Sequence, residues 1–332
     1  MPSIPSLAEI AEAAHQLTGR IVTTPSLPLT SDRLRPHLPA DAHVLMKMEL
    51  FQQAGSFKSR GVLLAIDAMD GAQRRAGVTA VSAGNHALAV SWGARQAGLS
   101  AKVVMPKTAD AIRVEGCKAL GAEVVLADNV EEAFEEVERL RQQEGRTMLH
   151  PFESPFMTLG AATCGHELAS AALARWGRVD AAIIPIGGGG LMSGMASAFH
   201  HLAPDCTIYG VEPEGADATH RSFNAGEPVA LEKVATMADS LGAPMALGHS
   251  FAINRQLVKS VVRLPEDAFP PAMQALYDAL KIIAEPACAA TFAALTGPLR
   301  DELAGKRVAI IACGSNISLR KFTALTQSPA PS

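Results

Sequence analysis

Residues 181–202 read AAIIPIGGGGLMSGMASAFHHL, and this stretch decides the fold. Its first six residues, Ala181–Ile186, are an apolar run that predicts a buried strand. The last twelve, from Leu191, predict a helix. The glycines between them form a tight turn that leads from the strand into the helix. A strand that passes directly into a helix is the repeating unit of a parallel α/β sheet.

The four glycines, Gly187–Gly190, also predict an anion site. Consecutive glycines let backbone N–H groups approach a phosphate closely, and a helix N-terminus adds a favourable partial charge. No Lys-Ser/Thr pair follows, so this is not a Walker loop, and Met192 and Ser193 stand where a dinucleotide motif needs its third glycine. A turn without a ligand is the simpler alternative. Glu212, at the end of the next predicted strand, resembles a ribose-binding acid and keeps a nicotinamide-dependent oxidoreductase as an alternative.

The same alternation of strands and helices runs through most of the chain, and Ser6 with Glu9 predicts a capping box for a first helix. The pattern predicts two α/β units packed closely together, with four parallel strands between about residues 78 and 153. The predicted strands are Val44–Leu50, Val78–Val81, Lys102–Met105, Glu123–Leu126, Met148–Pro151, Ala181–Ile186, Thr207–Glu212, Ser260–Leu264 and Arg307–Ala312. The predicted helices include Ser56–Met69, Ala87–Gln96, Ala109–Leu120, Glu131–Gln143 and Pro271–Ile283.

Composition limits the class of protein. The chain has 332 residues, of which 48% are hydrophobic and 19% charged, and its net charge is −4. These values exclude a disordered chain, and the lack of a basic excess argues against a nucleic-acid partner. No stretch reaches the ~20 apolar residues of a membrane span, and residues 1–20 lack a signal-peptide pattern. The five cysteines are scattered without a C-x-x-C pair, which predicts reduced thiols, no zinc site and a cytoplasmic location.

Three further segments are rich in glycine and polar residues, and each follows a predicted strand, where open α/β sheets bind ligands. Gly55–Gly61 contains Lys58, which alone is interpreted as a surface lysine but in a dry pocket could bond covalently to an aldehyde. Ser82–His86 precedes a helix, so its polar groups suit either a carboxylate or a simple N-terminal turn. In the segment Cys313–Asn316, Cys313 alone is interpreted as a small buried residue.

Together and in this order, the four segments resemble the fold-type II pyridoxal-phosphate enzymes, in particular the serine/threonine dehydratase (threonine ammonia-lyase) and serine racemase-like family. KMELFQQAGSFKSRG (47–61) resembles the lysine motif of this family, and SAGNHA (82–87) its substrate-carboxylate loop. GGGGL (187–191) resembles the phosphate loop, and CGSN (313–316) the segment at the pyridine nitrogen. Weaker similarity in GVEP, MADSLG and IIAEPACAA extends the resemblance over residues 24–319.

The resemblance implies a fold like that of tryptophan synthase β, with two open parallel-sheet α/β domains. Residues 1–77 and 154–322 would form a large cofactor-binding domain, and residues 78–153 a small domain inserted within it. Residues 323–332 are expected to form a disordered tail. A homodimer or homotetramer is also implied.

The resemblance further implies roles for individual residues. Lys58 would be the catalytic residue, which holds pyridoxal phosphate covalently and then acts as a base toward the substrate Cα. Cofactor contacts are implied for Phe57, Lys58, Asn85, Gly187, Gly188, Gly189, Gly190, Leu191, Glu285 and Cys313. Substrate contacts are implied for Ser82, Ala83, Gly84, Asn85 and His86. Cys313 stands where the family usually has serine, so its thiol would face the pyridine nitrogen as a neutral partner that suits β-elimination.

The implied reaction is β-elimination from a β-hydroxy amino acid, L-threonine or L-serine, to a 2-oxo acid and ammonia. A dehydratase for another such substrate, for example 3-hydroxyaspartate, is an alternative, as is a non-enzymatic amino-acid-binding protein. Arg113, His150 and Arg221 are candidates, by residue type alone, for sensing the substrate side chain. A serine racemase is less favoured because Ala83 stands where racemases of this branch place a proton-donating serine.

A metal site is implied only in part. Glu212 and the carbonyl of Ala216 match two of the three ligands in the metal loop of the family. The third position is Ala218, and Asp217 lies one residue early, so a cation would lack a ligand. The resemblance therefore leaves a divalent or monovalent cation open.

Overall fold

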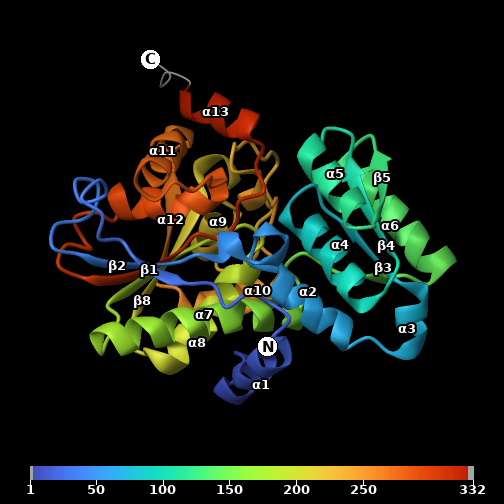
Figure 1. The fold of residues 1–332 in the computed structure, drawn as a ribbon, viewed down its shortest axis with the longest axis horizontal. Helices are drawn as coiled ribbons and strands as arrows, with labels where there is room; N and C mark the ends of the chain where they lie inside the picture. The colour runs from blue at the N-terminus through green and yellow to red at the C-terminus, as the bar shows by residue number, and fades with distance from the viewer. Residues whose placement is uncertain (1–2, 328–332) are drawn as a thin grey trace.

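The larger of two sheets draws its strands from both ends of the chain. The computed structural model describes residues 3–327, and within them this sheet has six strands. They are β1 (Ser26–Pro28), β2 (His43–Lys47), β7 (Ala181–Pro185), β8 (Thr207–Pro213), β9 (Ser260–Leu264) and β10 (Arg307–Ile311). In space the order is β1-β2-β10-β7-β8-β9, and all neighbours run parallel except β1, which is antiparallel to β2. Helices cover both faces of this sheet (Figure 1).

The smaller sheet lies to one side of the larger unit (Figure 1). Its strands are β3 (Val78–Val81), β4 (Ala101–Pro106), β5 (Glu123–Ala127) and β6 (Thr147–Met148). They are all parallel and lie in the order β5-β4-β3-β6. All four strands fall within residues 78–153. We propose that these residues form the small domain and that residues 1–77 and 154–322 form the large one.

Strand β6 is shorter than predicted, because the chain leaves the sheet after Met148. The ring of His150 explains the change in direction, since its Nδ1 accepts the backbone N–H groups of Phe152 (3.3 Å) and Glu153 (2.9 Å). The side chain thus closes a turn that replaces further pairing in the sheet. This turn brings residues 151 and 152 toward the larger unit.

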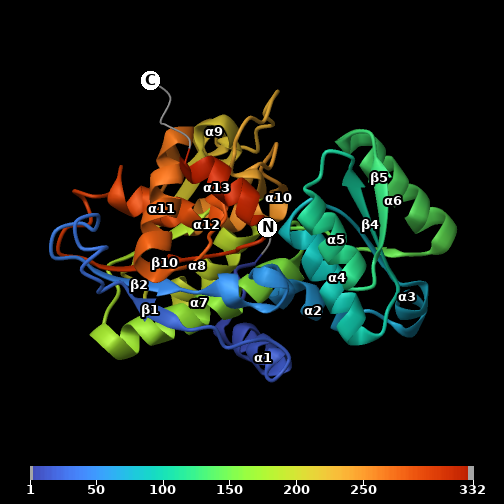
Figure 2. The same ribbon diagram turned by 45° about the horizontal axis from the view of Figure 1, so that its top comes forward.

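The helices pack on both sheets, and Ser6 and Glu9 form the predicted capping box at the start of the first helix. Helices α4 and α5 lie between the smaller sheet and the larger unit, whereas α6 covers the outer face (Figure 2). The helices are α1 (Leu7–Leu17), α2 (Lys58–Asp67), α3 (Gly71–Ala76), α4 (Asn85–Ala97), α5 (Ala111–Ala119), α6 (Val130–Glu144), α7 (Pro155–Trp176), α8 (Gly190–Leu202), α9 (Ala218–Ala225), α10 (Gly248–Leu257), α11 (Phe269–Leu280), α12 (Pro286–Thr296) and α13 (Leu319–Gln327). No helix within residues 3–327 is both long and apolar enough to span a bilayer.

Helix α7 was not among the predicted elements. Its sequence is rich in Ala and Gly, and it packs closely on α2 and α8, so it lacks the polar stripe that marks a surface helix. A Cβ added at Gly194 of α8 would lie 2.6 Å from the Cβ of Ala161 in α7, so the two helices need a residue without a side chain at this crossing. Close contact of this kind depends on the partner helix, so the hydrophobic pattern of α7 alone does not predict the helix.

The predicted disordered tail is wrong for residues 323–327, which belong to α13. Phe322 is buried in this helix, and its ring centroid lies 5.7 Å from that of Tyr277 in α11. This contact holds the helix on the larger unit. The remainder of the expected tail, residues 328–332, lies outside the described residues.

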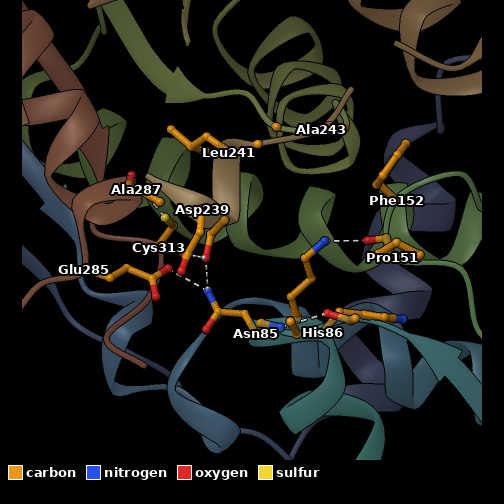
Figure 3. Close-up of a pocket in the computed structure, with 18 of the residues that line it drawn as sticks. Asn85, His86, Pro151, Phe152, Asp239, Leu241, Ala243, Glu285, Ala287 and Cys313 are labelled. Atoms are coloured by element: carbon orange, nitrogen blue, oxygen red, sulfur yellow. Dashed lines mark hydrogen bonds between the residues drawn. The ribbon is translucent and has the colours of Figure 1, made fainter. Parts of the chain in front are cut away.

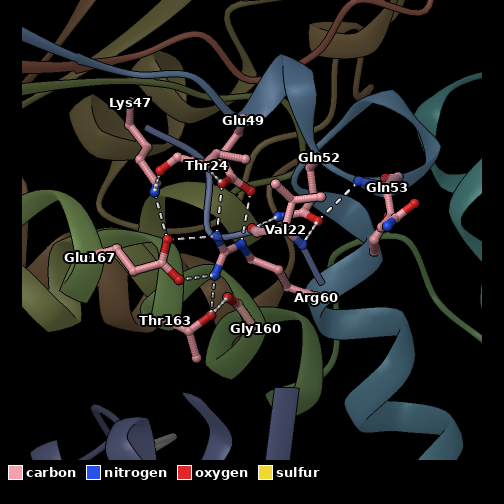
Figure 4. A network of polar contacts seen from close by, with 11 residues as sticks. Val22, Thr24, Lys47, Glu49, Gln52, Gln53, Arg60, Gly160, Thr163 and Glu167 are labelled. Atoms are coloured by element: carbon pink, nitrogen blue, oxygen red, sulfur yellow. Dashed lines mark hydrogen bonds and ion pairs between the residues drawn. The ribbon is translucent and has the colours of Figure 1, made fainter. Parts of the chain in front are cut away.

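A buried cluster of charged side chains fastens the start of α2 to α7 (Figure 4). Arg60 and Glu49 are both 0% exposed, and two hydrogen bonds of 2.8 Å join the guanidinium to the carboxylate. The same guanidinium donates to Glu167 of α7 at 2.7 and 2.9 Å, and the Lys47 amine donates to Glu167 at 2.6 Å. Lys58 lies two residues before Arg60, so this cluster also sets the position of the first turn of α2.

Candidate active site

One cavity of about 630 Å³ lies between the two sheets. The segments that follow β3 and β4 of the smaller sheet line it, together with those that follow β7 and β10 of the larger sheet. The carboxyl ends of parallel strands are the common place for ligands in open α/β sheets. The cavity therefore lies where the topology itself predicts a site.

The cavity collects all the residues predicted to contact the cofactor and the substrate. Those that line it are Phe57, Lys58, Ser82, Ala83, Gly84, Asn85, His86, Gly187, Gly188, Gly189, Gly190, Leu191, Glu285 and Cys313. Of the three residues chosen by type, Arg113 lines the cavity, whereas His150 lies just behind it and Arg221 is on α9. Glu212 and Ala216 also lie outside it.

Lys58 is the first residue of α2, and its side chain lines the cavity. The segment before it, Ser56–Phe57, is held in place by Gly314 and Cys313: Ser56 bridges to Gly314, and the Phe57 N–H donates to the Cys313 carbonyl at 3.2 Å. The Lys58 amine donates a hydrogen bond to the carbonyl of Pro151 (Figure 3). Burial lowers the pKa of this amine to about 8, so the amine loses its proton, and becomes nucleophilic, at a lower pH than an ordinary lysine does.

The glycine loop has a backbone that side chains would disrupt. Gly189 has a φ of +91°, and a Cβ at Gly187 would lie 2.9 Å from the carbonyl oxygen of Ser240. Ser250 of α10 donates to the Gly188 carbonyl at 2.9 Å, and Asn254 to the Gly189 carbonyl at 3.4 Å. The loop leads into α8, whose first N–H groups have no partner within the helix and attract anions. This cradle fits a phosphate monoester.

The loop after β3 supplies a second helix N-terminus, that of α4. The Ser82 hydroxyl accepts the Gly84 N–H at 3.1 Å, which forms the turn into the helix. His86 is buried, and its Nε2 is hydrogen-bonded to the Leu149 carbonyl at 2.7 Å. Burial, with a smaller contribution from the charge of Lys58, lowers the pKa of His86 to about 3, so its ring is neutral. A carboxylate at this loop would be bound by N–H groups rather than by a charged histidine.

Asn85 and Glu285 meet on the opposite side of the cavity (Figure 3). The Asn85 amide donates to the Glu285 carboxylate at 2.6 Å and accepts from Asn316 at 2.7 Å. The Cys313 thiol is buried beside them and donates to the Ala287 carbonyl at 3.6 Å. Burial raises the pKa of the Cys313 thiol, so a neutral group faces the cavity here.

Two features of the site were missed in the sequence. Phe152 lines the cavity directly after Pro151, and its only signal was its place after a predicted strand. The loop of residues 239–244 forms another wall, in which Asp239 pairs with Arg113 at 3.0 Å and with Lys321 at 3.1 Å. This loop contains part of the MADSLG segment, whose weak similarity to the family was its only sequence signal.

The residues suggested for a metal do not fit one. Both carboxylate oxygens of Glu212 accept backbone N–H groups, from Thr219 at 2.9 Å and from His220 at 2.8 Å, so Glu212 caps α9. Asp217 is paired with Arg221 and Arg263. Residues 3–327 hold no group of three His, Cys, Asp or Glu side chains placed to bind a metal. The nicotinamide-dependent oxidoreductase alternative depended on this same Glu212 carboxylate, whose two oxygens are already bound to the start of α9.

The cavity, by contrast, fits pyridoxal phosphate. A half-buried amine of lowered pKa suits the aldehyde of this cofactor, and the glycine cradle at the start of α8 suits its phosphate. The neutral Cys313 thiol suits an unprotonated ring nitrogen. These three groups converge on one cavity.

Comparisons with known proteins agree with this chemistry. A family model described as "Pyridoxal-phosphate dependent enzyme" matches residues 17–314. Phenylserine dehydratase of Ralstonia pickettii is 47% identical over 96% of each chain. L-threo-3-hydroxyaspartate ammonia-lyase of a Pseudomonas species is 36% identical, over 96% of this chain and 98% of the relative. The structure of maize serine racemase superimposes with a TM-score of 0.88, at 31% identity over 97% of each chain.

These matches confirm the predicted resemblance and the predicted fold class, two open parallel-sheet α/β units of the fold-type II kind. The family model spans the lysine segment, the asparagine loop, the glycine loop and the first two residues of the segment at Cys313. The chain therefore belongs to the pyridoxal-phosphate dependent enzymes.

Proposed function

We propose that this protein eliminates the hydroxyl group and then the amino group of a β-hydroxy amino acid, giving a 2-oxo acid and ammonia. The observation that carries the proposal is the half-buried Lys58 amine, of lowered pKa, in one cavity with the glycine loop. Two relatives whose names describe a dehydratase and an ammonia-lyase support it. We further propose that the protein is cytoplasmic and that it forms a homodimer or homotetramer. Light scattering of the purified protein would measure the oligomeric state.

Each part of the cavity has a role in this proposal. Bound pyridoxal phosphate supplies the electron sink that makes the substrate Cα acidic. The glycine loop and the first turn of α8 bind the phosphate, and the N–H groups at the start of α4 bind the substrate carboxylate. The Lys58 amine would hold the cofactor and would also serve as the base that takes the Cα proton of the substrate. The Cys313 thiol would stand at the ring nitrogen and keep its own proton, since burial raises its pKa.

The charges of the cavity favour a substrate with an uncharged side chain. A second carboxylate, as in 3-hydroxyaspartate, would need a free cation, but Arg113 and Lys321 are both paired with Asp239. We therefore propose threonine, serine or an aromatic analogue such as phenylserine, and the relative named phenylserine dehydratase supports the last of these. Ala83 continues to disfavour racemisation.

The test is release of 2-oxo acid and ammonia by the purified, cofactor-loaded protein from a panel of β-hydroxy amino acids of both configurations. We expect turnover of uncharged substrates and little of 3-hydroxyaspartate. Lys58→Ala should abolish the product, whereas Lys107→Ala, which changes an exposed lysine outside the cavity, should leave it unchanged. Protein that binds the cofactor but releases no 2-oxo acid from any member of the panel would overturn the proposal.

A further inference from the structure

Phe152 lines the cavity beside Lys58 and the glycine loop. It directly follows Pro151, whose carbonyl accepts a hydrogen bond from the Lys58 amine. The residue therefore lies next in the chain to the group that holds the reacting nitrogen. The ring also covers Gly188, where an added Cβ would overlap it. In Figure 3, Phe152 and Pro151 lie toward one side of the view, and Glu285 and Cys313 toward the other.

The position of the Phe152 ring is fixed by its neighbours. The edge of His150 meets it, with ring centroids 4.8 Å apart and an angle of 84° between the planes. The backbone N–H of Phe152 is bound by the same His150 side chain. On the other side, the Glu153 carboxylate accepts the N–H of His249 at 2.6 Å, which ties the segment to α10. A ring held in this way offers a prepared surface, so little entropy is lost when a ligand packs on it.

The surface that Phe152 presents is apolar and only partly covered by protein. Phe57 is the only other Phe, Tyr or Trp that lines the cavity within the described chain, and its ring centroid lies 5.1 Å from the Lys58 amine. Leu241 and Ala243 add apolar groups from the loop across the cavity. Aromatic rings prefer to pack edge-to-face or offset on one another, an attraction that adds to simple burial.

We propose that Phe152 is a specificity-determining residue that selects substrates with an aromatic group on Cβ. With the substrate carboxylate at the start of α4 and Cα beside the Lys58 amine, as proposed above, the Cβ substituent would lie near Pro151 and Phe152, because the Lys58 amine is bonded to the Pro151 carbonyl. This inference rests on the proposed function for the identity of the reaction. The inference adds the contact by which the protein distinguishes an aryl group on Cβ from a methyl group or a hydrogen.

Phe152 could instead serve only as a wall behind the glycine loop, and the two roles have different consequences. A wall affects cofactor affinity and lowers turnover of every substrate alike. A selecting ring affects only ligands that carry an aromatic group. The variant Phe152→Leu keeps an apolar side chain against Gly188 but removes the ring, and Phe156→Leu on α7 is the matched control outside this cavity.

The first readout is binding of L-phenylalanine and L-alanine to the cofactor-loaded protein, measured by spectral titration. Neither has a β-hydroxyl group to lose, so the titration reports contact and not turnover. We expect Phe152→Leu to raise the Kd of L-phenylalanine about tenfold, equivalent to ~1.4 kcal/mol. The Kd values of L-alanine and of the cofactor should stay within twofold, and Phe156→Leu should change none of them.

The second readout is kcat/KM for phenylserine and for threonine. Phe152→Leu should lower the value for phenylserine about tenfold, mainly through KM, and leave that for threonine within twofold. An equal loss for both substrates, or wild-type protein that binds L-phenylalanine no better than L-alanine, would overturn the role of Phe152. Selective binding of L-phenylalanine without 2-oxo acid from any substrate would instead overturn the proposed reaction.

Discussion

Replacing Arg60 by methionine tests the buried cluster that holds the start of α2 (Figure 4). The variant removes both hydrogen bonds of 2.8 Å to Glu49, whose carboxylate is 0% exposed and cannot be hydrated without opening the core. Glu167, whose side chain is 25% exposed, keeps Lys47 and reaches water. The cost therefore comes mainly from Glu49, and breaking one partner from a buried pair costs about 3–5 kcal/mol.

Thermal unfolding followed by circular dichroism measures this loss. An unfolding entropy of ~2.1 cal/mol/K per residue over 332 residues gives about 0.7 kcal/mol per kelvin, so 4 kcal/mol lowers Tm by roughly 6 °C. In Arg60→Met with Glu49→Gln the buried carboxylate is also removed, and at least half of the loss should be recovered. A Tm for Arg60→Met within about 1 °C of the wild type, or no recovery in the double variant, would refute the reasoning.

The pH dependence gives the sign of the effect. Burial by itself raises the pKa of Glu49, but in the wild type the Arg60 guanidinium, with smaller contributions from Lys47 and Thr24, outweighs burial and holds that pKa below its ordinary value. The carboxylate therefore stabilises the wild type above the unfolded pKa of ~4.3, and this contribution falls as the pH drops through the folded pKa. Without Arg60 only the Lys47 charge and the Thr24 hydroxyl still oppose burial, so the folded pKa of Glu49 rises and the variant gains stability, relative to the wild type, as the pH is lowered from 8 to 5.

Three further predictions concern the cavity. Gly187→Ala should raise the Kd of pyridoxal phosphate at least about tenfold, because the new Cβ would lie 2.9 Å from a backbone carbonyl of the 239–244 loop, whereas Gly71→Ala should leave the Kd within twofold. The rate at which apoprotein takes up the cofactor covalently, followed by absorbance, should rise with pH to half its maximum near 8 and level off above about pH 9, since burial lowers the pKa of Lys58 to about 8; a rate that keeps climbing beyond about pH 10 would contradict this environment. Ala83→Ser should introduce racemisation of serine, and recovered serine of unchanged chirality would show that the residue at position 83 does not govern it.

The local features of the fold and site were readable from the sequence. The glycine turn of residues 187–190 and the strand before it depend on neighbours in the chain, and spacing alone predicted both. Lys58 could be singled out because its motif stands in order with three others. The predicted start of its helix at Ser56 was two residues early, because Ser56 and Phe57 pair with the distant Gly314 and Cys313.

Features that depend on distant partners could not be predicted. Arg113 was a candidate by residue type, but its pairing with Asp239 joins residues 126 positions apart. Phe152 reaches the cavity only because the His150 ring turns the chain after β6. Glu212 is the opposite case, since a motif suggested a ligand where the structure has a helix cap. In each case the deciding contact crosses between segments that no local pattern connects.

The identity of the lysine that bonds to the cofactor tests the central claim most directly. Cofactor-loaded protein is treated with borohydride, which makes the link permanent, and peptide mass spectrometry then locates the added mass. The structure places one half-buried lysine amine of lowered pKa beside the glycine loop, so the label should appear on the peptide that contains Lys58. A label on another lysine, or none in protein saturated with pyridoxal phosphate, would contradict the account.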